Sequence, residues 1–151
     1  MIVGIASDHG GYTIKEQITN FLTRKLHTVK DFGTYSITSC DYPDYAAPVC
    51  AAVIGSEARF GILFCGTGIG MSMTANKISG IRAAVVSDVF SARATRAHND
   101  ANVLCLGQRV IGAGLAQAII EAFLKTSFEG GRHVARIEKM MLVNSRQSED
   151  V

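Results

Sequence analysis

Short apolar runs alternate with helix-forming patterns along nearly the whole of this 151-residue chain. Runs with strand character occupy residues 2–7, 27–32, 61–64, 83–86 and 103–106. Apolar residues at helical spacing predict helices over residues 11–25, 44–54, 71–78, 89–98 and 113–125, and a last helix after Gly130-Gly131 to about residue 145. Pro48 lies inside the second of these helices, so that helix either begins just before Pro48 or is kinked there.

Uniformly apolar strands that are separated by helices are typical of a parallel sheet covered on both faces. With right-handed crossovers, the five runs predict a three-layer α/β/α sandwich, Rossmann-like or flavodoxin-like, around a five-stranded parallel sheet. The length, with 48% hydrophobic and 19% charged residues, suits one domain over residues 1–151 with its own core.

Polar or glycine-rich segments directly follow four of the predicted strands, at the edge where such sheets bind ligands. They are Asp8-His9 after the first strand, Cys65 to Gly70 after the third, Ser87-Asp88 after the fourth and Gly107 to Arg109 after the fifth. A flavodoxin-like order places the first strand beside the third and brings Asp8 and His9 against the Cys65 loop. A Rossmann order does not.

The most informative of these segments, residues 60–70, reads FGILFCGTGIG. Glycines at every second position leave the backbone N–H groups accessible, and the helix that follows adds the positive end of its dipole. An anion or a developing oxyanion is therefore expected there. The same field favours the thiolate form of Cys65, which predicts catalysis as well as binding.

Charge and cysteine content narrow the class of protein. A formal net charge of +2 gives no general attraction to nucleic acid or membranes, although residues 132–146 are locally basic. The other three cysteines (40, 50 and 105) form no C-x-x-C pair and are expected to be unreactive. The first apolar run is too short for a signal peptide, and no run approaches the roughly 20 residues that span a bilayer. We therefore expect a soluble cytoplasmic protein.

A dinucleotide-binding module is the main alternative from another class. The glycine row lies between a strand and a helix, and Asp88 follows the next strand at the place of a ribose-binding acid. Against this, the spacing is G-x-G-x-G, the motif follows the third strand, and little chain remains for a substrate domain. A non-catalytic sugar-phosphate sensor is a second alternative, but it has no use for Cys65 or His98.

The chain resembles the ribose-5-phosphate isomerase B family, which also contains galactose- and allose-6-phosphate isomerases. The resemblance covers all but about the last dozen residues and rests on the order and spacing of several strings. They are SDHGG (7–11), DYP (41–43), CGTGIG (65–70), ANK (75–77), GIRA (80–83), HNDANV (98–103), GQRV (107–110) and EGGRH (129–133). It implies an aldose–ketose isomerase of the pentose phosphate pathway that works through an enediolate.

Catalytic roles are implied for four residues of this chain. Cys65 is the base that moves the carbon-bound proton, while His98, with Asp8 and Thr67 nearby, opens the sugar ring. Some members of the family use a glutamate a few residues further on, but Thr74, Ala75 and their neighbours offer no carboxylate. Cys65 is thus the available base.

Substrate-binding roles are implied for a larger set of residues. The N–H groups of the glycine loop face the enediolate oxygen, Asn99 and Tyr42 orient sugar hydroxyls, and one histidine and three arginines bind the phosphate. The full set is His9, Tyr42, Gly66, Gly68, Ile69, Gly70, Asn99, Arg109, Arg132 and Arg136. Arg132 and Arg136 are four apart and hence lie on one face of the last helix.

Assembly and cofactors follow from the same resemblance. The family builds its site between two subunits, so we expect a homodimer or tetramer in which the His98 segment or the C-terminal helix serves a neighbour's Cys65. No cofactor is expected. A zinc site among His9, His98, His133 and Asp8 is disfavoured, because no two of them have a spacing typical of zinc ligands. Because galactose-6-phosphate enzymes divide the site residues between two different chains, ribose 5-phosphate is favoured over the six-carbon phosphates.

Overall fold

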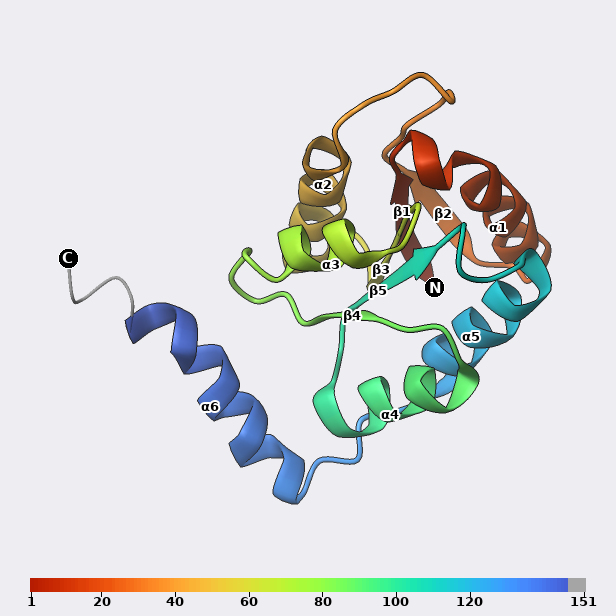
Figure 1. Ribbon diagram of the computed structural model, residues 1–151. Coiled ribbons are helices and arrows are strands. Elements are labelled where there is room, and N and C mark those ends of the chain that lie inside the picture. Colours follow the sequence, from red (N-terminus) through yellow and green to blue (C-terminus); the bar gives the residue numbers. More distant parts are fainter. Residues whose placement is uncertain (147–151) are drawn as a thin grey trace.

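The computed structural model describes residues 1–146 and contains one five-stranded parallel sheet between two layers of helices (Figure 1). The strands follow the order β2-β1-β3-β5-β4, and every neighbouring pair is parallel. They are β1 (Ile2–Ser7), β2 (Thr28–Asp31), β3 (Phe60–Cys65), β4 (Ala83–Val85) and β5 (Val103–Gly107). The three-layer parallel fold predicted from the alternation of apolar runs is confirmed.

Six α-helices and one short 3-10 turn complete the described chain. They are the turn η1 (His9–Gly11) and helices α1 (Tyr12–Arg24), α2 (Tyr42–Ile54), α3 (Ile69–Ala75), α4 (Val89–Asn99), α5 (Ala113–Lys125) and α6 (Arg132–Arg146). Helix α2 begins at Tyr42 and continues through Pro48, so of the two alternatives raised by the sequence the start just before this proline is wrong. Its first turn already holds Pro43, at a position where a missing N–H costs no helical hydrogen bond.

Alternation along the strands separates two apolar clusters, one on each face of the sheet. Ile62 and Phe64 of β3 join the cluster formed with α1, α4 and α5, whereas Leu63 and Cys65 join the cluster formed with α2 and α3. Since Cys65 is the last residue of β3, its side chain lies on the α2/α3 face, at the carboxyl edge of the sheet.

The strand order brings together the segments that were expected to meet. Strand β1 pairs with β3, with Ser7 in register with Phe64, so Asp8 follows directly beside Cys65. At the other side of the sheet the order departs from the flavodoxin-like one, because β5 lies inside and β4 forms the edge. The five residues of β5 are all buried, whereas the three of β4 are half-buried or exposed. The more apolar strand therefore takes the interior place.

Helix α6 projects away from the sheet and contacts the body through α4 (Figure 1). Apolar side chains such as Val134 and Met140 are exposed on it. Contact of this helix with a neighbouring subunit stays a prediction. No helix within residues 1–146 is both long and apolar enough to cross a membrane.

Candidate active site

Cys65 ends β3 and begins the glycine loop. Its side chain is 5% exposed, and its Sγ accepts a hydrogen bond from the N–H of Gly68 at 2.9 Å. Gly68 has a φ of +80°, which L side chains rarely adopt, and a Cβ there would lie 2.9 Å from a methyl group of Val85. The glycine thus permits the turn that brings a backbone donor against the sulfur.

The amide groups of this loop are only partly used by the loop itself. The N–H of Ile69 donates to Thr67 Oγ1 at 3.3 Å, and that of Gly68 donates to Cys65 Sγ. Within residues 1–146, the N–H groups of Gly66, Thr67 and Gly70 have no acceptor in the chain. These three donors remain for a ligand, which is the arrangement an oxyanion needs.

Asp8 and His9 lie beside this loop at the end of β1. The Oδ1 of Asp8 accepts hydrogen bonds from Gly10 N at 2.8 Å and Gly11 N at 3.1 Å, so this buried carboxylate caps the following turn. The Nδ1 of His9 lies 3.2 Å from both the backbone nitrogen and the carbonyl oxygen of Cys40. The long polar loop before α2 therefore fixes the orientation of the His9 ring.

Two further predicted residues cover the glycines. A Cβ on Gly66 would lie 3.3 Å from the guanidinium carbon of Arg109, and a Cβ on Gly70 would lie 2.9 Å from the ring of Tyr42. Both side chains are exposed at the carboxyl edge of the sheet. Arg109 is held in place because its N–H donates to the carbonyl of Gly66 at 2.9 Å. We call Asp8, His9, Tyr42, Cys65–Gly70 and Arg109 the cysteine half-site.

His98 and Asn99 do not join the cysteine half-site within one chain. Helix α4 starts after β4, at the carboxyl edge, and ends just before β5 begins, at the amino edge. Strand β5 separates the two edges, and its five residues span about 16 Å. Within one chain His98 therefore does not lie near Asp8 and Thr67. The expectation that the His98 segment serves the Cys65 of a neighbouring subunit stays a prediction.

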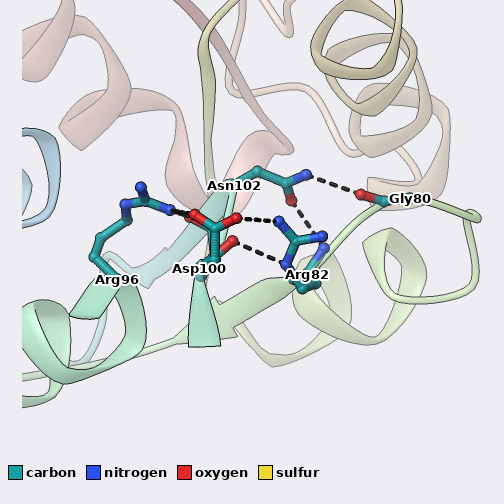
Figure 2. Close-up of polar contacts among 6 residues, drawn as sticks. Gly80, Arg82, Arg96, Asp100 and Asn102 are labelled. Atoms are coloured by element: carbon teal, nitrogen blue, oxygen red, sulfur yellow. Dashed lines mark hydrogen bonds and ion pairs between the residues drawn. The ribbon is translucent and has the colours of Figure 1, made fainter. Parts of the chain in front are cut away.

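The turn that carries His98 is held by a polar network (Figure 2). Asp100, with a φ of +47°, ends α4, and its carboxylate pairs with Arg82 at 2.8 Å and with Arg96 at 2.7 Å. Asn102 accepts from the N–H of Arg82 and donates to the carbonyl of Gly80. These bonds tie the end of α4 to the chain that enters β4.

A second group of predicted residues gathers around His98. Its ring stacks on that of His133, with centroids 4.6 Å apart and planes 13° from parallel. The Oε2 of Glu129 lies 3.8 Å from the Nε2 of each ring. Desolvation by burial, aided by the positive charges of His98, Arg132 and Arg136, lowers the pKa of His133. We call His98, Asn99, Arg132 and Arg136 the histidine half-site.

Local geometry also bears on the predictions for the buried cysteines and for Asp88. Burial raises the pKa of Cys50 to about 11 and that of Cys105 well above its usual value, as expected for unreactive thiols. Asp88 caps α4 by accepting from the N–H of Ser91 at 2.7 Å. This carboxylate is thus occupied as a helix cap, which removes the main support for a dinucleotide-binding module.

Four residues that shape the two half-sites received no site role from the sequence: Cys40, Gln108, Glu129 and His133. Cys40 positions His9, and Gln108 Oε1 accepts from the N–H of Ile14 at 2.9 Å, which links the Arg109 segment to α1. Nothing in the sequence pattern marks these contacts. Glu129 and His133 stand four apart in the sequence, but Glu129 lies in the loop before α6, so helical spacing does not mark their contact either.

Comparison with known proteins identifies relatives of this chain. Residues 3–140 match the family model described as Ribose/Galactose Isomerase. Ribose-5-phosphate isomerase B of Escherichia coli is 44% identical over 146 residues, which cover 97% of this chain and 98% of that protein. The structure of ribose-5-phosphate isomerase B from Clostridium thermocellum superposes with a TM-score of 0.96 at 48% identity, covering 97% of this chain and 99% of the other.

A third comparison includes a ligand. The crystal structure of ribose-5-phosphate isomerase B from Mycoplasma genitalium with bound ribulose-5-phosphate has a TM-score of 0.89 at 41% identity, covering 99% of this chain and 97% of the other. The match to the family model and the near-complete coverage of these relatives extend over the Cys65 loop, the His98 turn and the start of α6. The chain therefore belongs to the ribose/galactose isomerase family.

Proposed function

We propose that this protein is an aldose–ketose isomerase that interconverts ribose 5-phosphate and ribulose 5-phosphate through an enediolate. The observation that carries the proposal is Cys65 at the head of a loop with three unoccupied backbone donors. Relatives that cover nearly the whole chain are named ribose-5-phosphate isomerase B, and one of them was crystallised with ribulose-5-phosphate.

The reaction moves one proton between neighbouring carbons. The thiolate of Cys65 removes the proton from C2 of the open-chain aldose, and the electron pair shifts to the carbonyl oxygen at C1. The N–H groups of Gly66, Thr67 and Gly70 then donate to the enediolate oxygen, and loss of one such donor costs about 3 kcal/mol in a typical transition state. Return of the proton from Cys65 to C1, with transfer of a hydroxyl proton from O2 to O1, yields the ketose and restores the thiolate.

The histidine half-site supplies what the cysteine half-site lacks. His98 transfers a proton to or from the ring oxygen when the furanose opens, and Asn99 orients a sugar hydroxyl. Arg132 and Arg136 bind the phosphate dianion through their guanidinium groups, together with the guanidinium of Arg109 and the imidazole of His9. Since β5 separates the two half-sites, the proposal requires a homodimer in which the histidine half-site of each chain faces the cysteine half-site of the other.

Exposed apolar side chains on the segments that end or follow β3, β4 and β5 support this assembly. Ile69 and Met73 of α3, Val85 at the end of β4, Phe90 at the start of α4 and Val110 after β5 are 43–79% exposed. A second chain that covers them would bury a patch too apolar to be common on a monomer. No metal or organic cofactor takes part in the proposed proton transfers.

Subunit complementation tests the shared site directly. Cys65→Ala and His98→Asn each remove one half of every site, so each variant alone should be inactive with ribose 5-phosphate. After the two are unfolded together and refolded, random pairing should restore roughly a quarter of the native activity, because half of the dimers then carry one intact site of two. Absence of any recovery from a dimeric mixture would show that each chain uses its own residues.

Substrate comparison tests the sugar and the role of His98. Ribose 5-phosphate, allose 6-phosphate and galactose 6-phosphate are assayed side by side, and the five-carbon sugar should give the largest kcat/KM. A four-carbon aldose 4-phosphate cannot close a furanose ring, so His98→Asn should impair its isomerisation much less than that of ribose 5-phosphate. Equal losses with both sugars would contradict ring opening by His98.

A further inference from the structure

Three potential metal ligands converge beside the histidine half-site. They are His98 at the end of α4, Glu129 in the loop before α6, and His133 in the first turn of α6. One ligand atom from each lies within 4.8 Å of the other two, and the Oε2 of Glu129 is 3.8 Å from both Nε2 atoms. Glu129 and His133 have no part in the proposed reaction.

We infer that His98, Glu129 and His133 form a binding site for a divalent transition metal such as Zn²⁺, and that metal bound there inhibits the isomerase by occupying the Nε2 of His98. Two imidazoles and one carboxylate, with a fourth position left to water, are a common ligand set for zinc. In a tetrahedral site with bonds of about 2.0–2.2 Å, neighbouring ligand atoms lie about 3.4 Å apart. The observed 3.8 Å separations exceed this distance by only a few tenths of an ångström, and the two stacked imidazole rings must also rotate so that both Nε2 lone pairs point at the ion.

The backbone brings together the segments that carry these three residues. Gly130 and Gly131 have φ values of +67° and +56°, and this left-handed turn sets Glu129 directly before the first turn of α6. No atom lies within 4 Å of where a Cβ would stand on either glycine, so the turn requires glycine for its backbone conformation and not for space. The N–H of Glu129 also donates to the carbonyl of Ala97 at 3.0 Å, which fixes the loop to the end of α4.

The local charge sets how tightly a cation binds. Glu129 supplies one negative charge, whereas Arg132 and Arg136 are close enough for their positive charges to act on His133. The site should therefore bind more weakly than a structural zinc site with four protein ligands. Such a site suits reversible inhibition by free metal better than a permanent cofactor.

Direct binding tests the site independently of the activity. Zn²⁺ is titrated by calorimetry into the Cys40→Ser/Cys65→Ser protein, which removes the thiols of the cysteine half-site and of its neighbour Cys40 as competing ligands. One Zn²⁺ should bind per chain. His133→Ala and Glu129→Gln in this background should each weaken binding roughly tenfold or more. His27→Asn, which removes a histidine at the start of β2, is the matched control and should bind like its parent.

Co²⁺ gives a second readout that a merely structural effect cannot mimic. With the native cysteines present, Co²⁺ at this site should show d–d absorption without the thiolate charge-transfer band that ligation by Cys65 would produce. Failure to bind metal in the Cys40→Ser/Cys65→Ser background, or equal binding by the His133→Ala variant, would overturn the site and leave the proposed function untouched.

Inhibition of the isomerase by bound Zn²⁺ rests on the proposed ring-opening role of His98. Enzymatic activity is therefore measured separately from metal binding. Zn²⁺ should inhibit turnover of ribose 5-phosphate, a chelator should restore it, and His133→Ala should be less sensitive to Zn²⁺ than its parent. Inhibition should be weaker with the four-carbon aldose phosphate, which needs no ring opening. Stoichiometric binding without inhibition would confirm the metal site and overturn the role of His98.

Discussion

The Sγ of Cys65 lies 2.9 Å from the backbone nitrogen of Gly68, at the only turn of the glycine loop with a left-handed φ. Strand β3 thus positions the sulfur of Cys65, and the turn at Gly68 places a backbone N–H donor against it. Because Cys65 is nearly buried while Gly66 and Gly70 are partly accessible, a substrate reaches the sulfur from the side of the free N–H groups. This contact links the local backbone conformation to the proposed chemistry.

Replacement of Cys65 by alanine should abolish isomerisation while the fold persists. Loss of a positioned acid–base group typically costs about 10²–10⁴-fold in rate. Activity is measured with ribose 5-phosphate, and folding by thermal unfolding monitored by circular dichroism. Cys50→Ala is the matched control, since this thiol is buried and its pKa is raised to about 11, and it should keep most of the activity. Retention of more than a few per cent by Cys65→Ala would remove this residue as the base.

Gly107→Ala should damage catalysis through the backbone of the glycine loop. The added Cβ would lie 2.6 Å from the carbonyl carbon of Thr67, so the loop must shift. A displacement of about 1 Å can cost on the order of 100-fold in rate. Gly114→Ala, where no atom lies within 4 Å of the new Cβ, is the control and should leave kcat unchanged. Native kcat in the Gly107 variant would mean that the loop tolerates this shift.

The double variant Arg132→Gln/Arg136→Gln should mainly raise KM for phosphorylated sugars. Both side chains are exposed on one face of α6, and guanidinium groups bind a phosphate dianion strongly. Arg24→Gln, which removes an exposed arginine of α1, serves as the control. Steady-state kinetics decide the matter: an unchanged KM in the double variant would assign Arg132 and Arg136 to an ordinary solvated helix face.

Lys15→Ala should destabilise the fold strongly. The side chain of Lys15 is fully buried in α1, and its Nζ lies 2.6 Å from Oδ2 of Asp31. Removing one partner leaves Asp31 partly buried and unpaired, which should cost about 3 kcal/mol of unfolding free energy. Urea denaturation measures the loss. Lys15→Met/Asp31→Asn should recover part of it, because the only carboxylate of the described chain then left without Lys15 is the exposed one of Glu16. A double variant as unstable as Lys15→Ala would contradict the ion-pair explanation.

Stability should fall as the pH drops below the ordinary histidine value of 6.5. Desolvation by burial, with the nearby N-terminal charge, lowers the pKa of His27, and its Nδ1 is buried without a hydrogen-bond partner in the described chain. The unfolded chain therefore takes up the proton more readily than the folded one, so the stability present above pH 6.5 is lost as the pH falls toward the lowered pKa. Urea midpoints at pH 7.5 and 5.5 should differ less in His27→Asn than in the native protein. An identical difference would exclude His27 as the source.

Local sequence patterns determined the strands and helices and the residue types that follow each strand. Apolar runs predicted the five strands, and apolar residues at helical spacing predicted the six α-helices. These patterns are readable because the buried faces of a strand or helix determine where its apolar residues occur along the sequence. The glycine row predicted the loop at Cys65 for the same kind of local reason: the φ of +80° at Gly68 favours glycine strongly, and the absence of a side chain on Gly66 leaves room for Arg109. The family resemblance added the roles of individual residues.

Tertiary structure alone decided how those elements combine. Strand β5 lies between β3 and β4, and it is fully buried whereas β4 is not. This order depends on the relative burial of two strands, which the sequence of either strand alone does not show. His98 carries no local sign that it lies about one strand length from Cys65, because that separation is set by the direction of α4 relative to the sheet. The sequences of α4 and of the segment before α6 do not show, taken separately, that His98, Glu129 and His133 meet. This contact forms because the Gly130-Gly131 turn brings Glu129 and His133 against the end of α4. Contacts between distant segments follow from packing of the whole chain, which local periodicity does not encode.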